Sequence, residues 1–314
     1  MQNQNNISQK IKSQAKELGF LECVIIPAGF LEEEEAHFKN WLNAGMHGEM
    51  GYMARNVEKR LDPRLLLENA KTVIVVLQNY FPKEIQKDPE APVLSKYAYG
   101  TDYHFIMKDK LKKLLAFIQE QIGTCNALPF VDSAPVLERA WARRAGLGWV
   151  GKNSNLISVQ HGSFFFIGEL ILDIELSYDN PKPVADHCGT CIRCIDACPT
   201  KAIVANRVVD ARKCISYQTI ELKGELDENL KGQFENRVFG CDICQDVCPW
   251  NLKSVPHSEK SFEPHPKLLK LSNTDWHQME RPLFNELFKN SAVKRTGFKG
   301  IKRNLKFVES DING

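Results

Sequence analysis

Two rows of cysteines in the last third of the sequence are the residues best suited to chemistry. Their spacings are C-x-x-C-x-x-C-x-x-x-C-P and C-x-x-C-x-x-x-C-P, and their members are Cys188, Cys191, Cys194 and Cys198, then Cys241, Cys244 and Cys248. The first spacing is that of bacterial ferredoxins, in which three thiolates hold one 4Fe-4S cluster and the fourth binds a second cluster. Cys214, between the rows, completes a set of eight thiolates. The spacing therefore predicts two 4Fe-4S clusters.

The fourth cysteine of a ferredoxin row crosses to the other cluster, which predicts the thiolates that belong together. The first three cysteines of the first row are expected to share a cluster with Cys248, and the other set is expected to be Cys198, Cys214, Cys241 and Cys244. Disulfides would require an oxidising compartment, and zinc sites usually show paired C-x-x-C knuckles. Clusters are therefore the favoured interpretation, and zinc is the main alternative.

Length and composition describe an ordinary globular protein. The 314 residues are 43% hydrophobic and 25% charged, with a formal net charge of +2, which suits two or three domains with a sizeable core. The first ten residues are polar, unlike a signal peptide, and no segment approaches the roughly 18 apolar residues that span a bilayer. We expect a cytoplasmic protein. Cys23 and Cys125 lie alone in apolar surroundings and are expected to be small buried side chains.

The residues ahead of the cysteine rows alternate between helical and strand patterns. Periodic apolar residues predict helices, and short aliphatic runs between turn residues predict strands. In chain order we expect a helix over 7–18, a strand over 23–26, a helix over 32–45, a strand over 73–77, a helix over 105–122, and strands over 128–131, at Val159 and over 164–172. This alternation predicts an α/β or α+β domain over residues 1–180. Pro181 and Pro183 mark its boundary with a cluster module over 181–255.

The last segment, residues 256–314, is expected to be helical and basic, with a short helix around 283–288. Beyond that helix, cations recur at spacings that place them on one helical face, namely Arg295, Lys299, Lys302, Arg303 and Lys306. Another face carries an apolar stripe of Phe298, Ile301, Leu305 and Val308. This pattern predicts a docked helix that offers its basic side to phosphate groups, with a solvated amphipathic helix as the alternative.

Three stretches of the first domain could line a ligand site. Residues 146–153 are rich in glycine and end in Lys-Asn, which suits either a loop around a large flat ligand or a structural turn. Asp132 ends a strand, where an aspartate serves helix capping as well as acid catalysis. An aromatic group forms either a pocket wall or a packed surface turn, and it comprises Tyr97, Tyr99, Tyr103 and His104.

These stretches together resemble a known family. Combined with the two cysteine rows, they closely resemble epoxyqueuosine reductases. The matching sequences are YAYGTDYH (97–104), VDSAPVLER (131–139) and GLGWVGKN (146–153). The resemblance implies reduction of epoxyqueuosine to queuosine at the wobble position of tRNAs with GUN anticodons, using base-off cobalamin and two 4Fe-4S clusters. The implied fold is α+β, with a cobalamin-binding α/β domain over 1–180, a ferredoxin-like module with two clusters over 181–255, and a short helical C-terminus.

The resemblance also implies roles for particular residues. The general acid of the family falls on Asp132, and cobalamin contacts are implied at Asn56, Arg60, Ser95, Asp132, Lys152, Asn153, Asn155, Ser216 and Asp242. Contacts with tRNA are expected from Lys223, Lys294, Arg295, Lys299, Lys302 and Arg303. Many members of the family continue into a helical-repeat domain that helps to hold tRNA. Affinity for tRNA is therefore expected to be weaker here, or to rest more on the basic segment.

The implied reaction needs two electrons and two protons, because the epoxide oxygen leaves as water. Clusters transfer one electron at a time, so two of them can supply a cobalt centre in successive steps from an external low-potential donor. An ordinary aspartate has a pKa of about 3.9, so Asp132 must be buried or hydrogen-bonded to stay protonated at neutral pH. We expect a monomer. The alternatives are a cobalamin-dependent reductive dehalogenase-like enzyme and a ferredoxin-like electron carrier.

Overall fold

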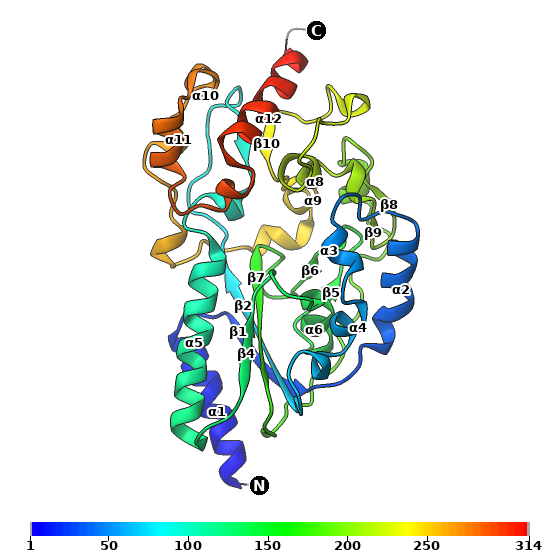
Figure 1. Ribbon diagram of the computed structural model, residues 1–314, viewed down its shortest axis with the longest axis vertical. Coiled ribbons are helices and arrows are strands. Elements are labelled where there is room, and N and C mark those ends of the chain that lie inside the picture. The colour runs from blue at the N-terminus through cyan, green and yellow to red at the C-terminus, as the bar shows by residue number, and fades with distance from the viewer. Residues whose placement is uncertain (1, 313–314) are drawn as a thin grey trace.

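A four-stranded sheet forms the centre of the N-terminal half of the protein in the computed structural model, which describes residues 2–312 (Figure 1). The strands stand in the order β1 (Glu22–Pro27), β2 (Thr72–Asn79), β7 (Phe165–Leu172) and β4 (Ala127–Phe130). Every neighbouring pair is antiparallel. The first domain is therefore α+β, and the parallel sheet of an α/β fold, which the alternation of elements also allowed, does not form.

Helices cover both faces of this sheet because its two inner strands are apolar on both sides. All residues of β7 are buried, as are those of β2 except its last. On one face α1 (Gln2–Glu17) and α5 (Tyr103–Ile122) pack against the sheet. On the other face α6 (Glu138–Arg144) packs through Trp141, on the side where α2 (Glu32–Asn43) and α4 (Val57–Leu61) lie (Figure 1).

The helix expected over 105–122 is confirmed as α5. Its N-terminus is capped by Asp102, whose carboxylate accepts a hydrogen bond from the His104 amide at 3.0 Å. The strand expected at Val159 is wrong. This residue lies in a turn between β6 (Leu156–Ile157) and β7, and 40% of its surface remains exposed. An apolar residue in a tight turn gives the same local signal as one in a short strand.

The two cysteine rows occupy short helices and loops beside the sheet. α7 (Arg193–Asp196) and α9 (Ile243–Asp246) lie within the rows and pack against each other. α8 (Ile215–Ile220) begins directly after Cys214. Two small hairpins complete this region, formed by β5 (Trp149–Val150) with β6 and by β8 (Ile203–Ala205) with β9 (Val208–Val209).

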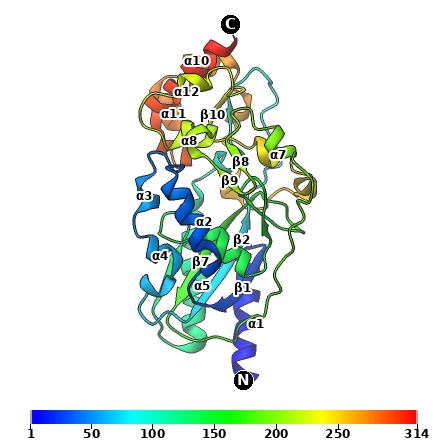
Figure 2. The same cartoon turned by 90° about the vertical axis from the view of Figure 1, so that its right-hand side faces the viewer.

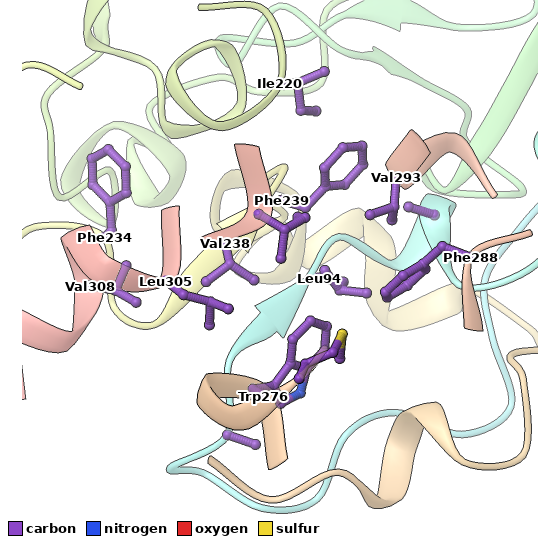
Figure 3. Packing of buried hydrophobic residues seen from close by; sticks show 14 of the residues in the cluster. Leu94, Ile220, Phe234, Val238, Phe239, Trp276, Phe288, Val293, Leu305 and Val308 are labelled. Atoms are coloured by element: carbon purple, nitrogen blue, oxygen red, sulfur yellow. The ribbon is translucent and has the colours of Figure 1, made fainter. Parts of the chain in front are cut away.

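The C-terminal segment shares a hydrophobic core with the second cysteine row. α12 (Gly297–Ile312) buries Ile301, Leu305 and Val308 in this core, which confirms the apolar stripe. The core also takes Trp276 from α10 (Asn273–Gln278) and side chains of α11 (Arg281–Leu287), as Figure 3 shows for Trp276. The core extends to β10 (Arg237–Phe239), which pairs in parallel with β3 (Val93–Leu94). This core contains residues from 91–99, from the expected cluster module (181–255) and from the last segment (256–314). The division of the chain into three domains therefore stays a prediction.

The molecule is elongated, with the two termini at opposite ends (Figures 1 and 2). The sheet lies toward the N-terminal end and α10, α11 and α12 lie toward the C-terminal end, with the cysteine-bearing helices near the middle. Over residues 2–312, none of the helices combines the length and the apolar character needed to cross a membrane.

Candidate active site

A cavity of about 670 Å³ lies between the sheet and the second cysteine row. Sites for cofactors and small molecules typically measure about 300–1,000 Å³. The wall includes the first residues of β7, one side of α2, the loop that carries Asp132, the start of α6, and the loops around the cysteines. Residues that are far apart in the sequence therefore meet around one cavity that is open to solvent on one side.

Asp132 lies in the loop between β4 and α6 and lines the cavity, with half of its side chain exposed. Its backbone is left-handed (φ 52°), a conformation that non-glycine residues rarely adopt and that local contacts must hold. The Asp132 amide donates a hydrogen bond to the Glu138 carboxylate, and the Tyr103 hydroxyl donates one to Asp132 Oδ2 at 2.7 Å. The capping interpretation is wrong, because α6 begins only at Glu138 after Leu137.

Asp132 and His104 form an ionic pair beside the cavity. His104 Nε2 lies 3.6 Å from Asp132 Oδ2, and His104 Nδ1 lies 2.7 Å from Asp102 Oδ1. Burial lowers the pKa of His104, but its hydrogen bond to Asp102 and the charges of Asp102 and Asp132 outweigh burial and raise the pKa to about 9. Burial raises the pKa of Asp132, but His104 and Tyr103 bring it below 3.8. At neutral pH the proton of this pair therefore sits on His104, and Asp132 is ionised.

Two further carboxyl groups, which no sequence motif singles out, lie near Asp132. Burial, followed by the charge of Asp132, raises the pKa of Glu138 to about 8. Glu169 is fully buried in β7, and neither of its carboxyl oxygens has a hydrogen-bond partner within the described part of the chain. Burial raises the pKa of Glu169 well above its ordinary value of 4.5, so it is neutral. Its sequence signal was a single acidic residue inside an otherwise apolar strand.

Most positions that were implied for cobalamin lie on the cavity wall, namely Arg60, Ser95, Asp132, Asn153, Asn155, Ser216 and Asp242. Asn56 and Lys152 are not among the wall residues. Asn56 is exposed at the start of α4, and Lys152 donates a hydrogen bond through Nζ to the Gly189 carbonyl at 2.8 Å. Lys152 thus ties the glycine-rich stretch to the first cysteine row.

The glycine-rich stretch serves close packing as well as the cavity. A Cβ added to Gly148 would stand 2.1 Å from the Ile157 carbonyl oxygen, so the β5–β6 hairpin needs glycine there. The asparagines that follow hold the second cysteine row. Asn153 donates to the Cys244 carbonyl at 3.2 Å, and Asn155 Nδ2 lies 3.8 Å from Cys244 Sγ. The structural-turn interpretation is confirmed for Gly148, and the ligand-loop interpretation stays a prediction.

The aromatic group is divided between the cavity and the neighbouring core. Tyr97 and Tyr103 line the cavity, and the Tyr103 ring stacks on Phe166 with centroids 4.1 Å apart. Tyr99 is buried in the C-terminal core instead. The pocket-wall interpretation therefore holds for two of the tyrosines.

The electrostatic neighbours of the cysteine thiols lie mainly within two groups, and one contact crosses between them, from Cys194 to Cys244. After burial, the thiols that raise the pKa of Cys194 are Cys188, Cys248 and Cys191. For Cys214 the neighbouring thiol is Cys198, and for Cys241 it is Cys214. One group lines the cavity, and its members are Cys198, Cys214, Cys241 and Cys244. The other four thiols lie outside its wall.

The cations that were predicted to contact tRNA differ in their surroundings. Arg303 donates hydrogen bonds to the carbonyls of Gln218, Leu222 and Gly224 at 3.1, 2.9 and 2.6 Å, so it holds the loop after α8. Others are also engaged by the protein: Lys302 with the His277 carbonyl at 2.5 Å, Lys223 with the Ile220 carbonyl at 3.1 Å, and Arg295 with Glu221 at 2.8 Å. Lys294 and Lys299 are exposed.

Comparison with known proteins agrees with these features. Residues 187–251 match a 4Fe-4S double cluster binding domain, and residues 60–133 match the model of epoxyqueuosine reductase QueG. The epoxyqueuosine reductase of Cellulophaga algicola is 55% identical over 302 residues, which cover 96% of this chain and 98% of that protein. The chain belongs to the epoxyqueuosine reductase family. It is an oxidoreductase of queuosine synthesis with a 4Fe-4S double-cluster domain, which confirms clusters over zinc.

Solved structures show the same fold. An epoxyqueuosine reductase in complex with a tRNA-Tyr stem loop carrying epoxyqueuosine has a TM-score of 0.90 at 28% identity, and the match covers 98% of this chain and 82% of that one. A reductive dehalogenase structure, described as suggesting a mechanism for B12-dependent dehalogenation, has a TM-score of 0.50 at 17% identity and covers 96% of this chain and 38% of that one. This second likeness is one of fold alone.

Proposed function

We propose that this epoxyqueuosine reductase removes the epoxide oxygen of epoxyqueuosine at the wobble position of tRNAs with GUN anticodons, with cobalamin bound in the cavity. The observation that carries the proposal is the presence of Asp132 and four cysteines of the cluster module on one cavity wall. An acid and a source of electrons thus border the same space. The likeness to a reductase solved with an epoxyqueuosine-modified stem loop supports tRNA as the substrate.

The wall has the donor set expected around a cofactor whose edge carries amide groups. Arg60 Nε is buried without a hydrogen-bond partner among the described residues, and Asn155 and Ser216 add an amide and a hydroxyl. Amides need both donors and acceptors, which these side chains provide. We assign the edge of cobalamin to Arg60, Ser95, Asn153, Asn155, Ser216 and Asp242. When bound, cobalamin supplies the two-electron reducing chemistry that amino-acid side chains lack.

The two clusters act in series in this proposal. The first cluster takes Cys188, Cys191, Cys194 and Cys248, and the second takes Cys198, Cys214, Cys241 and Cys244. The cavity wall supports this membership, because it holds the four thiols of the second set and none of the first. Because the second set alone lines the cavity, a cluster held by these four thiolates would supply electrons there one at a time, and a cluster held by the first set would lie farther from the substrate.

Protons reach the substrate through Asp132 and are stored on His104. Breaking both carbon–oxygen bonds of the epoxide with two electrons gives an alkene, and the oxygen leaves as water after taking two protons. A substrate that closes the cavity excludes water and raises the pKa of a carboxyl group. The proton then moves from His104 Nε2 to Asp132 Oδ2, 3.6 Å away, and on to the oxygen. His104 takes up a second proton from solvent and repeats the transfer.

In this proposal the exposed cations contact the tRNA backbone. Lys294 and Lys299 are free to reach phosphate groups. Arg303, Lys302, Lys223 and Arg295 act mainly by holding α12 and the loop after α8 in place. A few phosphate contacts give weak, salt-dependent binding, so specificity rests on the modified base in the cavity.

Reaction of the purified, cluster-containing protein with epoxyqueuosine-modified tRNA tests the proposed function. Dithionite supplies the electrons under anaerobic conditions, and mass spectrometry of the nucleosides detects a product lighter by one oxygen atom. The product is expected only when cobalamin is added. A product that forms equally without cobalamin would contradict the cofactor assignment, and no product with all components would contradict the proposed reaction.

A further inference from the structure

The loop between β4 and α6 depends on outside contacts to hold Asp132 in its observed direction. β4 ends at Phe130 and α6 begins at Glu138, so residues 131–137 belong to neither element. The backbone of Asp132 has a φ of 52°, which a residue with a β-carbon keeps only where its surroundings hold it. Over residues 2–312, the Asp132 amide finds no backbone acceptor. A side chain must therefore satisfy this amide.

Glu138 supplies that acceptor from six positions further along the chain. Its Oε1 accepts the hydrogen bond of the Asp132 amide, and the same side chain lines the cavity. Glu138 is the first residue of α6, a helix that is packed on the sheet through Trp141, which is 1% exposed. A packed helix positions a side chain more precisely than a loop does. Glu138 thus connects a fixed element to the left-handed residue.

Other side chains that contact the loop hold different parts of it. The Tyr103 hydroxyl donates to the Asp132 side chain at 2.7 Å, and Lys108 Nζ donates to Ser133 Oγ at 2.9 Å. Both of these bonds are made to side-chain atoms. The bond from the Asp132 amide to Glu138 acts on the backbone instead, so it governs where the Asp132 side chain starts.

Glu138 can make this bond without carrying a charge. Burial, followed by the charge of Asp132, raises the pKa of Glu138 to about 8, so its carboxyl group is mostly protonated at neutral pH. The carbonyl oxygen of a protonated carboxyl group still accepts a hydrogen bond, and glutamine offers the same oxygen on a side chain of the same length. A role through negative charge at the N-terminus of α6 would instead be lost in glutamine.

We propose that Glu138 is a positioning residue for Asp132, whose left-handed backbone it holds so that the Asp132 carboxyl group points at the reacting oxygen. The inference rests on the proton transfer proposed for Asp132 and adds the residue that aims it. Glu138 gives no proton to the substrate in this account. Loss of its acceptor should slow the chemical step and leave tRNA affinity and both clusters unchanged.

Hydrogen–deuterium exchange at the Asp132 amide tests the bond without substrate or cobalamin. The cluster-containing protein is compared with Glu138→Leu, which removes the acceptor, and with Glu138→Gln, which keeps it. Exchange is expected to be about tenfold faster in Glu138→Leu and close to the wild-type rate in Glu138→Gln. Glu58→Leu is the matched control, because Glu58 also lies in the first turn of a helix but is exposed and outside the cavity wall. Unchanged exchange in Glu138→Leu would overturn the proposal.

Single-turnover queuosine formation then shows whether Glu138 acts through Asp132. With cobalamin and dithionite, we expect a rate about tenfold lower in Glu138→Leu and a nearly normal rate in Glu138→Gln. Combined with Asp132→Asn, Glu138→Leu should add no further loss, because both changes disable the same step. A loss that multiplies in the double variant, or Glu138→Gln as slow as Glu138→Leu, would contradict the positioning role. Failure of the wild-type protein to form product would contradict the proposed function, and the exchange rates would still decide whether Glu138 holds the loop.

Discussion

At Asp132, two hydrogen-bond donors and a neighbouring cation compete with burial for control of one carboxyl group. Burial alone would favour the protonated form of Asp132 that the proposed reaction uses, but His104 and Tyr103 hold the carboxylate in its ionised form. The proton that Asp132 lacks is present on His104, whose own charge is stabilised by Asp102 as well. The pair therefore keeps one transferable proton beside the cavity over the whole neutral pH range.

Substitution of His104 tests this storage role. His104→Gln preserves a polar group next to Asp102 but cannot release a proton, so turnover is expected to fall by about 10²-fold. Wild-type activity should decline as the pH rises through about 9, where His104 loses its proton. The variant should lack that decline. A variant with the same alkaline limb as the wild-type protein would show that His104 is not the stored acid.

Glu169 should reduce the stability of the fold at neutral pH. Its pKa is ordinary in the unfolded chain and raised in the folded protein, so ionisation above pH 4.5 favours the unfolded state. The stability gained by Glu169→Gln should therefore grow with pH above 4.5, by up to about 1.4 kcal/mol per pH unit. Denaturant unfolding at several pH values measures this difference in the free energy of unfolding. Glu175→Gln is the control, because Glu175 is exposed. A gain that does not change with pH would mean that Glu169 ionises normally.

Among the elements, the sequence predicted local structure well and pairing poorly. The spacing of apolar residues identified α5 and the apolar stripe of α12, because residues three or four positions apart lie on the same side of a helix. It did not distinguish a parallel from an antiparallel sheet, since both can join the same short strands. The pairing of β2 with β7 connects residues about a hundred positions apart, and no local pattern encodes that contact.

The cations of α12 are expected to have two roles, binding tRNA and stabilising the fold. Lys299→Gln should reduce the slope of log affinity for tRNA against log salt by roughly 0.7–0.9 and leave stability unchanged. Arg303→Gln should instead lower stability by about 1–3 kcal/mol, because it removes hydrogen bonds from a charged donor to three carbonyls. Salt titrations of binding and thermal unfolding separate the two effects. Equal effects of both variants on both quantities would contradict this division.

The loop before α8 should contribute a ligand to the second cluster. Cys214→Ser removes one of four thiolates and should lower the iron content after anaerobic reconstitution from about eight toward about four atoms per chain. Cys125→Ser is the control, because Cys125 is buried in the sheet core away from both rows. Unchanged cluster spectra and iron content in Cys214→Ser would show that the membership is wrong.

In the whole molecule, the candidate active-site cavity lies where three parts of the chain meet. The sheet domain contributes Asp132, the cluster module contributes Cys244, and residues 95–97 contribute Ser95 and Tyr97 to the same wall. The cysteines could be recognised from their spacing alone, because local spacing is what binds a cluster. The cavity residues could be named only through family resemblance. Glu138 was missed because its bond to the Asp132 amide depends on a left-handed loop that no sequence pattern specifies.

Asp132→Asn tests whether Asp132 passes protons to a substrate that is reduced in this cavity. The amide preserves size and hydrogen bonding, so the variant should fold, keep both clusters, bind cobalamin and permit its reduction. In single-turnover reactions with epoxyqueuosine-modified tRNA, the account predicts that queuosine formation falls by about 10²- to 10⁴-fold relative to the wild-type protein. Wild-type rates of queuosine formation in this variant, with normal cluster and cobalamin spectra, would contradict it.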